Sequence, residues 1–131
     1  MRYFHGVVHK DADSAFGVHF PDLPGCFSAA DTIDDVIPNA VEALSLWFED
    51  GDGAAAPSSI ETVRAAAVND LAEGAFLVMV PWIGRHNKSA RINISLDHAV
   101  LDAIDKAAAL RRLTRSAFLA EAARNEIEGR R

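Results

Sequence analysis

The sequence has a single cysteine and no long hydrophobic run, and each shortage excludes a class of protein. Because Cys26 stands alone, the chain can form no internal disulfide and no metal site built from several cysteines. No apolar run reaches the roughly eighteen residues of a membrane span. Residues 1–11 also lack the apolar stretch of a signal peptide. We therefore expect a cytoplasmic protein that contacts no membrane.

Length and composition limit the number of domains. The chain has 131 residues, half of them hydrophobic, so it can bury a core. By length it forms one domain or two very small ones. A piece of about 45 residues folds with difficulty by itself, because so short a chain buries too little apolar surface.

Basic residues are scarce in one part of the chain only. Residues 1–84 hold three basic and thirteen acidic residues, a net charge of −10. Residues 85–131 hold ten basic and six acidic residues, a net charge of +4. An acidic region can bind a basic protein, and a basic region can bind the phosphates of nucleic acid. Two solvent-exposed surfaces can also differ in this way by chance, so charge alone leaves both interpretations open.

The N-terminal region favours β-strands. Residues 2–9 and 15–20 are rich in Tyr, Phe and Val, and the polar segment DADS lies between them. Pro24-Gly25 suits the central positions of a type II turn, since glycine readily adopts a positive φ. The segment FSAA, residues 27–30, follows as a short third strand. We predict a hairpin, a tight turn and this third strand.

A long amphipathic helix follows the third predicted strand. Thr32 is placed to cap its N-terminus, with Asp35 in a position like that of a capping box. Apolar residues then recur at helical spacing, at positions 33, 36, 37, 40, 41, 44, 47 and 48. Pro38 lies inside this pattern and should kink the helix or shift its hydrogen bonds. Because the spacing continues past Pro38, we predict one helix, with Trp47 and Phe48 in the core.

The region after this helix alternates between loop and regular structure. Residues 50–59 contain glycine, proline and serine and predict a loop. Ser59 can cap a short helix through residues 60–67, and residues 69–74 predict a turn. The continuous apolar run AFLVMVPW, residues 75–82, predicts a buried central strand that ends near its proline.

The C-terminal region combines one strand with two helices. It follows a linker at residues 84–89, where the charge changes sign. Asp97 is placed to cap one helix and Thr114 a second, each with an apolar residue before it and another at the fourth helical position. In the segment ARINISLDHAV, residues 90–100, apolar and polar side chains alternate, which predicts a half-buried strand.

This predicted strand has no partner within the C-terminal region. Two helices joined by a tight turn cannot pair with the backbone of the strand, so the strand needs another strand edge. The simplest partner is a second copy of the chain, which gives an antiparallel two-stranded ribbon under four helices. We expect an obligatory homodimer whose core contains Ile92, Ile94 and Leu96.

The free face of such a ribbon suits DNA. A two-stranded ribbon fits the major groove, where arginine bonds guanine and asparagine bonds adenine. The N-terminus of the second helix offers backbone N–H groups to a phosphate. An alternating strand is commonly only a solvent-exposed face, so the spacing alone does not decide. On this interpretation Arg91, Asn93 and Ser95 read bases, and Lys88, Thr114, Arg115 and Ser116 contact phosphates.

Two stretches of the C-terminal region resemble the ribbon–helix–helix family of DNA-binding proteins. They are SARINISLDHAVLDAID and LTRSAFLAEAAR, and together they cover about 40 residues. The resemblance implies the same base-reading and phosphate-binding residues. The family often has glycine before the leucine of the inter-helix turn, where this chain has Arg112. Arg112 must therefore adopt an unfavourable left-handed conformation, or the turn must differ.

The N-terminal region resembles the HicB-type antitoxins. The stretch GVHFPDLPGCFSAADTIDDVIPNAVEALSLWFED contains the PDLPGC-like turn, Pro21–Cys26, and the helix that Thr32 begins. The resemblance implies an α+β protein with a partial ribonuclease-H-like ββ(β)αβ domain at residues 1–83. A linker at 84–89 and a ribbon–helix–helix βαα module at 90–131 complete the chain. Whether the N-terminal domains associate further into tetramers stays open.

The same resemblance implies a type II toxin–antitoxin role. The partner would be a HicA-like toxin, a small basic mRNA interferase, bound by the acidic N-terminal domain because opposite charges favour association. The ribbon dimer would bind operator DNA and repress its own operon. The alternative is a free-standing ribbon–helix–helix transcriptional regulator whose N-terminal domain senses a ligand or only oligomerises. A neighbouring gene for a short basic protein would favour the antitoxin.

Catalytic and metal-binding patterns are weak. A ribonuclease-H-like nuclease needs carboxylates that hold two metal ions, and the predicted strands 2–9, 15–20 and 75–82 contain none. The histidines at 5, 9, 19, 86 and 98 show no zinc-ligand spacing with a second ligand type. The first three could meet across paired strands, but a solvent-exposed or half-buried face is the favoured interpretation. We expect no enzymatic activity, no metal site and no cofactor, and Cys26 as a small buried residue.

Overall fold

The structure, a computed structural model, describes residues 1–49, 55–84 and 88–130. The chain divides into two compact units, Met1–Gly84 with Glu128–Arg130, and Arg85–Ile127 with Arg131. We refer to residues 1–84 as the sheet unit and to residues 88–127 as the helix-pair unit. Parts of the predicted loop and linker, residues 50–54 and 85–87, lie outside the described residues.

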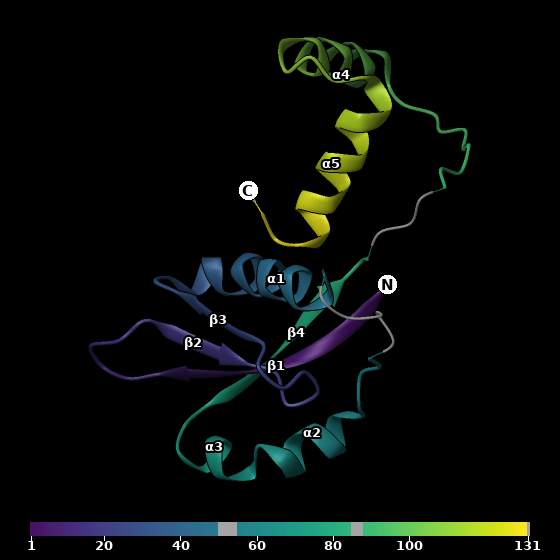
Figure 1. The fold of residues 1–131 in the computed structure, drawn as a ribbon. Coiled ribbons are helices and arrows are strands. Elements are labelled where there is room, and N and C mark those ends of the chain that lie inside the picture. The colour runs from purple at the N-terminus through teal and green to yellow at the C-terminus, as the bar shows by residue number, and fades with distance from the viewer. Residues whose placement is uncertain (50–54, 85–87, 131) are drawn as a thin grey trace. The chain divides into compact units, whose positions relative to one another are not determined.

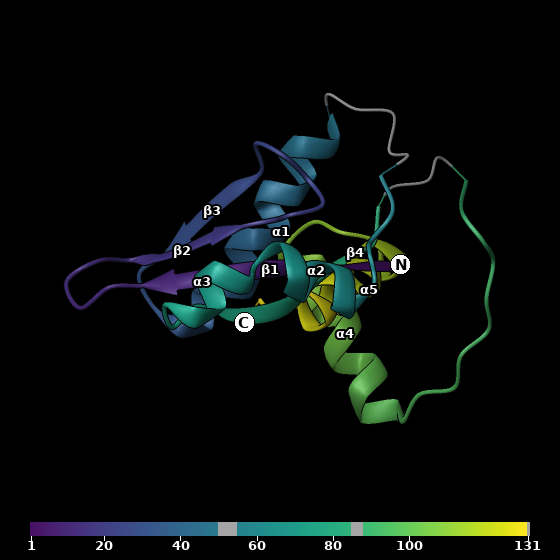
Figure 2. The ribbon, with the colours of Figure 1, turned by 90° about the horizontal axis from the view of Figure 1, so that it is seen from below.

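A four-stranded antiparallel sheet of order β3-β2-β1-β4 forms the centre of the sheet unit (Figure 1). Its strands are β1 (Arg2–Lys10), β2 (Phe16–His19), β3 (Phe27–Ala30) and β4 (Phe76–Trp82), and its helices are α1 (Ile33–Glu49), α2 (Ile60–Ala66) and α3 (Val68–Ala72). The hairpin and the short third strand predicted from the sequence are confirmed. Helix α1 covers one face of the sheet, and α2 and α3 cover the other (Figure 1 and Figure 2).

The prediction that residues 75–82 form a central strand is wrong. Strand β4 lies at the edge of the sheet and pairs only with β1 among the described strands. The prediction attributed the apolar run to a central position, but at the edge two of its residues, Phe76 and Met79, are exposed. The strand also continues through Pro81 to Trp82. An edge strand tolerates proline, since the missing N–H group can face away from the neighbouring strand.

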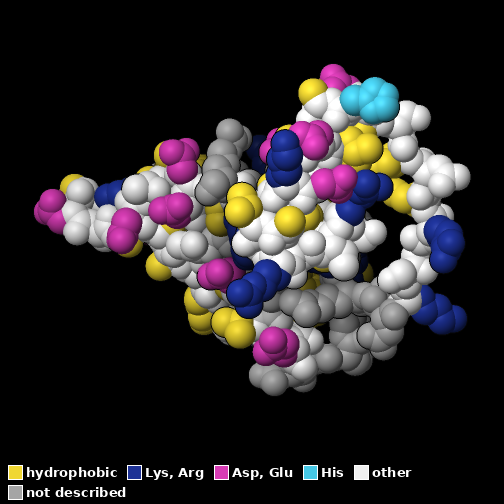
Figure 3. All heavy atoms as spheres, turned by 90° about the horizontal axis from the view of Figure 1, so that it is seen from above, with side chains coloured by type: hydrophobic (Ala, Val, Ile, Leu, Met, Phe, Trp, Pro, Cys, Tyr) yellow, Lys and Arg dark blue, Asp and Glu magenta, His cyan; other side chains and the backbone are white. Residues whose placement is uncertain are grey.

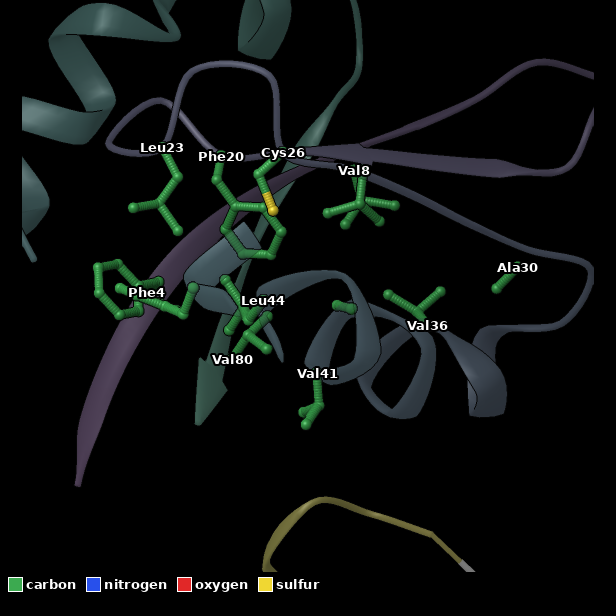
Figure 4. Packing of buried hydrophobic residues seen from close by; sticks show 13 residues of the cluster. Phe4, Val8, Phe20, Leu23, Cys26, Ala30, Val36, Val41, Leu44 and Val80 are labelled. Atoms are coloured by element: carbon green, nitrogen blue, oxygen red, sulfur yellow. The ribbon is translucent and has the colours of Figure 1, made fainter. Parts of the chain in front are cut away.

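Helix α1 forms as its apolar spacing predicts, and Pro38 lies within it. Its buried residues pack with residues of all four strands to form the main core, in which the side chains of Phe20, Leu44 and Val80 converge (Figure 4). Phe48 is buried in this core, as predicted, and Trp47 packs against it half-buried.

The predicted type II turn before β3 is confirmed. Gly25 has a φ of +84°, and the Cys26 N–H donates to the Leu23 carbonyl over 3.0 Å. Cys26 is buried as predicted, and burial raises the pKa of its thiol to about 11. The thiol is therefore protonated at neutral pH and serves to fill the core.

The second face of the sheet has a smaller core. Val8 belongs to the main core on the α1 side of the sheet. Because successive residues of a strand point to opposite faces, the side chain of Val7 lies on the other side. Val7, Val63 and Ala67 are all buried. Ser59 caps α2 as predicted, because its hydroxyl accepts from the Thr62 N–H. The predicted turn at 69–74 is wrong in its first part, since Val68–Ala72 form helix α3 directly after Ala67.

The helix-pair unit consists of α4 (His98–Leu110) and α5 (Arg115–Ile127). Both helices begin at the predicted caps. The predicted strand is not formed in the single chain: residues 88–97 are neither helical nor paired with any described strand. A lone extended segment cannot form a ladder without a second strand edge.

Of the helices within the described ranges, none combines the length and the apolar content needed to cross a bilayer.

Candidate nucleic-acid interface

All three predicted base-reading residues, Arg91, Asn93 and Ser95, are exposed in the segment before α4. The three apolar residues that alternate with them are exposed as well: Ile92 is 74% exposed, Ile94 57% and Leu96 39%. Exposure of three large aliphatic side chains in a row is unfavourable, because each loses the free energy of burial. The single chain thus brings the predicted readers to the surface but gives their apolar neighbours no core.

The start of α4 fixes where this extended segment ends. The Asp97 carboxylate accepts from the N–H groups of Ala99 and Val100, at 2.6 and 3.2 Å. Such a cap stabilises a helix by about 1 kcal/mol, since it pairs N–H groups that otherwise have no partner. Asp97 therefore makes His98 the first residue of the helix and ends the non-helical segment before it.

The turn between α4 and α5 has the hydrogen bonds of a Schellman motif. The Leu113 N–H donates to the Ala108 carbonyl at 2.8 Å, and the Arg112 N–H donates to the Ala109 carbonyl at 3.1 Å. Arg112 has a φ of +56° and is the one non-glycine residue in the described chain with a positive φ. Of the two alternatives that the sequence left open, a left-handed Arg112 or a different turn, the structure has the left-handed residue.

The predicted phosphate site lies at the start of α5. The Thr114 hydroxyl accepts from the Ala117 N–H at 3.1 Å, so Thr114 is the cap, and Ser116 is exposed. The Arg115 guanidinium forms two hydrogen bonds of 2.9 Å with the Asp105 carboxylate of α4. This contact lowers the pKa of Asp105. Lys88, the fourth predicted phosphate ligand, is exposed in the segment before α4.

Sequence reasoning missed the ion pairs that join the two helices. Besides Arg115 and Asp105, the Arg111 guanidinium bonds the Glu121 carboxylate at 2.6 Å. In each pair the two residues are ten positions apart. That spacing spans the inter-helix turn, so a pattern within one helix cannot reveal it. These exposed pairs link α4 to α5, and the pair of Arg115 lies at the N-terminus of α5.

The helix-pair unit has almost no core of its own. Ala108 is the single buried residue of α4, and α5 has none. Several large apolar residues of the two helices are exposed, among them Val100 (47%), Leu110 (86%) and Ile127 (46%). A unit of this kind cannot gain enough free energy from burial to fold without a further apolar surface.

The sheet unit carries a groove of mixed polar and apolar lining between β3 and α1. Its volume is about 590 Å³, and Phe27 and Leu46 on its lining are 72% and 65% exposed. The Trp47 indole N–H donates to the Pro24 carbonyl over 3.0 Å, which holds one wall. Glu42 also lines the groove and adds a negative charge. Exposed large apolar residues beside an acidic group are typical of a protein-binding surface.

The carboxylates considered for a nuclease do not gather into a site. Asp11 and Asp13 are exposed at the β1–β2 turn, and Asp22 accepts from the N–H and the hydroxyl of Ser58, at 2.8 and 2.6 Å. Within residues 1–49, 55–84 and 88–130, no group of three carboxylates lies close enough to share a metal ion. Asp22 instead anchors the segment that precedes α2.

Comparison with known proteins identifies the family. A family model described as HicB_like antitoxin of bacterial toxin-antitoxin system matches residues 4–123. The chain is 37% identical to the antitoxin HicB of Burkholderia pseudomallei, with a TM-score of 0.53 and 97% of each chain covered. It is 31% identical to the antitoxin HicB3, with a TM-score of 0.51, over 95% of this chain and 97% of that one.

A further relative comes from a bacteriophage. It is an uncharacterized 14.9 kDa protein in the rep-hol intergenic region of Haemophilus phage HP1, 31% identical over 92% of this chain and 95% of that protein. The mixed α+β fold with a four-stranded antiparallel sheet matches the HicB antitoxin structures. The chain belongs to the family of HicB-like antitoxins of bacterial toxin–antitoxin systems.

Proposed function

We propose that this antitoxin neutralises a HicA-like mRNA interferase by direct binding and represses its own operon by binding operator DNA. In this proposal, residues 1–83 are a partial ribonuclease-H-like domain that binds the toxin, residues 84–89 are the linker, and residues 90–131 are a ribbon–helix–helix module that binds DNA. The chain itself has no enzymatic role. One observation carries the DNA-binding part: the segment 90–96 is exposed and unpaired in front of two helices that lack a core.

A second copy of the chain accounts for that observation. Pairing of two 90–96 segments would satisfy their backbone groups and turn Ile92, Ile94 and Leu96 of both copies toward the helices. The exposed apolar residues of α4 and α5 would then lie in a shared core. The dimer forms through this module, and tetramers form if the sheet units associate as well.

The same pairing would create the DNA-reading face. Because side chains alternate along a strand, Arg91, Asn93 and Ser95 of both copies would project from the face opposite the core. Arginine and asparagine each give bidentate contacts to a purine in the major groove, whereas serine discriminates weakly. The N–H groups at Thr114–Ser116 would hold a phosphate at the start of α5, with Arg115 positioned by Asp105 and Lys88 adding charge.

The sheet unit supplies features that suit a small basic toxin. Acidic side chains gather at the end of the sheet where the β1–β2 turn is located, and a basic side chain lies beside them (Figure 3). Residues 1–84 carry a net charge of −10, which favours association with a basic protein. The groove with exposed Phe27 and Leu46 offers the apolar contact that long-range attraction alone does not provide.

Two measurements test the two halves of this proposal. Co-expression of the chain with the small basic protein encoded next to it should restore growth, and failure to restore growth would contradict the antitoxin role. A gel shift on the DNA upstream of the gene, with random duplex as control, tests repression. Specific binding without rescue by the chain would instead identify a free-standing regulator.

A further inference from the structure

Two histidines of neighbouring strands lie side by side on the face of the sheet that α2 and α3 cover. His9 of β1 is opposite Gly17, and His19 of β2 is opposite Val7, so the two histidines are diagonal neighbours on one face. Their rings are stacked, with centroids 5.5 Å apart and planes 20° from parallel. Both side chains therefore point the same way, toward α3.

An aspartate of α3 meets both rings. The Nε2 atom of His9 is 3.3 Å from Oδ1 of Asp70, and the Nε2 atom of His19 is 4.0 Å from Oδ2 of the same carboxylate. One ligand atom from each of the three residues can be chosen so that all lie within 4.8 Å of one another. Among the described residues, His9, His19 and Asp70 form the one group of three potential metal ligands with this spacing.

The spacing of these atoms suits a shared ion better than direct hydrogen bonds. Both distances exceed the roughly 2.7–3.2 Å of an ordinary N–H···O bond. Ligands at about 2.0–2.1 Å from a tetrahedral zinc ion are separated from one another by about 3.3 Å. His9 and Asp70 already have that separation, and His19 needs only a small side-chain movement to reach it.

The chemistry of the three ligands selects the class of ion. Two imidazoles and one carboxylate suit zinc and similar divalent transition metals, whereas calcium and magnesium prefer oxygen ligands alone. The side chains of His9, His19 and Asp70 are 40%, 33% and 34% exposed, so solvent can supply the remaining ligands. Three protein ligands with an open position form a metal site that can exchange its ion with solution.

We propose that His9, His19 and Asp70 form a binding site for a divalent transition-metal ion of the zinc class, which ties α3 to strands β1 and β2. Helix α3 has only five residues and buries none of them, so it contributes little packing of its own. A metal ion bonded to both strands and to the helix would hold it against the sheet. This site involves neither the groove nor the proposed DNA-reading residues. The proposal of a metal site can therefore be tested independently of the proposed function.

Sequence reasoning missed this site because the third ligand was not apparent. His9 and His19 were considered together across paired strands, but Asp70 was placed in a predicted turn. The helix that follows Ala67 brings Asp70 under the two histidines. No spacing rule along the chain connects a residue of α3 with two strands more than fifty positions earlier.

Titration of the full-length protein with Zn²⁺ against a chromophoric chelator tests the proposal. We expect one ion per chain at this site, and Co²⁺ in its place should give a visible absorption band from imidazole and carboxylate ligands. The variant Asp70→Asn, which keeps the size of the side chain, should lower the affinity at least about tenfold, as should His19→Asn. The control His98→Asn, which removes an exposed histidine of α4, should leave the affinity unchanged.

Two structural readouts separate metal binding at this site from binding elsewhere. Saturating Zn²⁺ should raise the Tm of the sheet unit by about 5 °C or more in the unchanged protein. It should also slow amide hydrogen exchange in Val68–Ala72, and both effects should disappear in Asp70→Asn. Zinc affinity that is equal in the unchanged protein and in Asp70→Asn would overturn the proposal, as would the absence of binding at micromolar Zn²⁺.

Discussion

The sheet unit and the helix-pair unit differ in where their apolar side chains lie. In the sheet unit, residues such as Phe4, Leu44 and Val80 are fully buried between strands and helix α1. In the helix-pair unit, Ile92 and Leu110 are mostly exposed, and a single alanine is buried in its two helices. The first unit has a core within one chain, whereas the second has the secondary structure of a folded module without a core. We therefore expect the second unit to gain its stability from another molecule, as in the proposed dimer.

The largest effect is expected from a charge in the predicted ribbon. Ile94→Asp would place a carboxylate in the shared core, which costs several kcal/mol unless the charge is paired, so the dimer should be lost. Analytical ultracentrifugation should show a smaller species, and operator binding should disappear. The control Ser95→Asp, one residue further on, should retain the dimer. If the Ile94→Asp variant had the same oligomeric state as the unchanged protein, the proposed ribbon dimer would be contradicted.

A truncation in the core of the sheet unit should act differently. Leu44→Ala removes a fully buried side chain and should lower the free energy of unfolding by about 2–5 kcal/mol, with no dependence on protein concentration. Leu46→Ala, two positions further along the same helix and 65% exposed, should change it by less than about 0.5 kcal/mol. Denaturant titrations that gave similar losses for both variants would contradict the placement of the core.

DNA recognition should separate base-reading from phosphate-binding residues. Arg91→Ala should cost about 1–3 kcal/mol on the operator and relax specificity at one base pair. Lys88→Ala should weaken binding to all sequences alike and lower the salt slope by about one unit. Fluorescence anisotropy on operator and random duplex at several salt concentrations distinguishes the two. Equal losses on both duplexes for Arg91→Ala would remove Arg91 from the base readers.

The smallest effect concerns the turn within the helix-pair unit. Arg112→Gly should stabilise the module by about 0.5–1 kcal/mol, because glycine adopts the left-handed conformation that Arg112 holds at a φ of +56°. Arg112→Ala removes the same charge but keeps the strain, so it should bring no such gain. Thermal unfolding at a fixed protein concentration compares the three proteins, and equal Tm changes for both variants would assign the effect to charge.

Local patterns predicted the parts of the fold that depend on neighbouring residues. The spacing of apolar residues predicted α1 correctly despite Pro38. The Pro24-Gly25 pair predicted the turn before β3. Ser59 and Asp97 predicted where α2 and α4 begin. Each of these signals acts over a few residues, so it can be read from one segment of sequence.

Features that depend on distant residues were harder to predict. The edge position of β4 depends on which strand it pairs with, and a run such as AFLVMVPW is apolar in either place. The pair of Arg115 with Asp105 and the approach of Asp70 to His9 arise only once the helices are packed. In our proposal the strand at 90–96 forms only with a second chain, and in the single chain this segment is unpaired.

Amide hydrogen exchange of residues 91–96 in the unmodified protein tests the central claim most directly, namely that this segment forms backbone pairs only with its counterpart in a second chain. The account predicts slow exchange of alternate amides at micromolar protein, which becomes fast on dilution as the dimer dissociates. Fast exchange of every amide in the segment at concentrations where the protein is dimeric would contradict it.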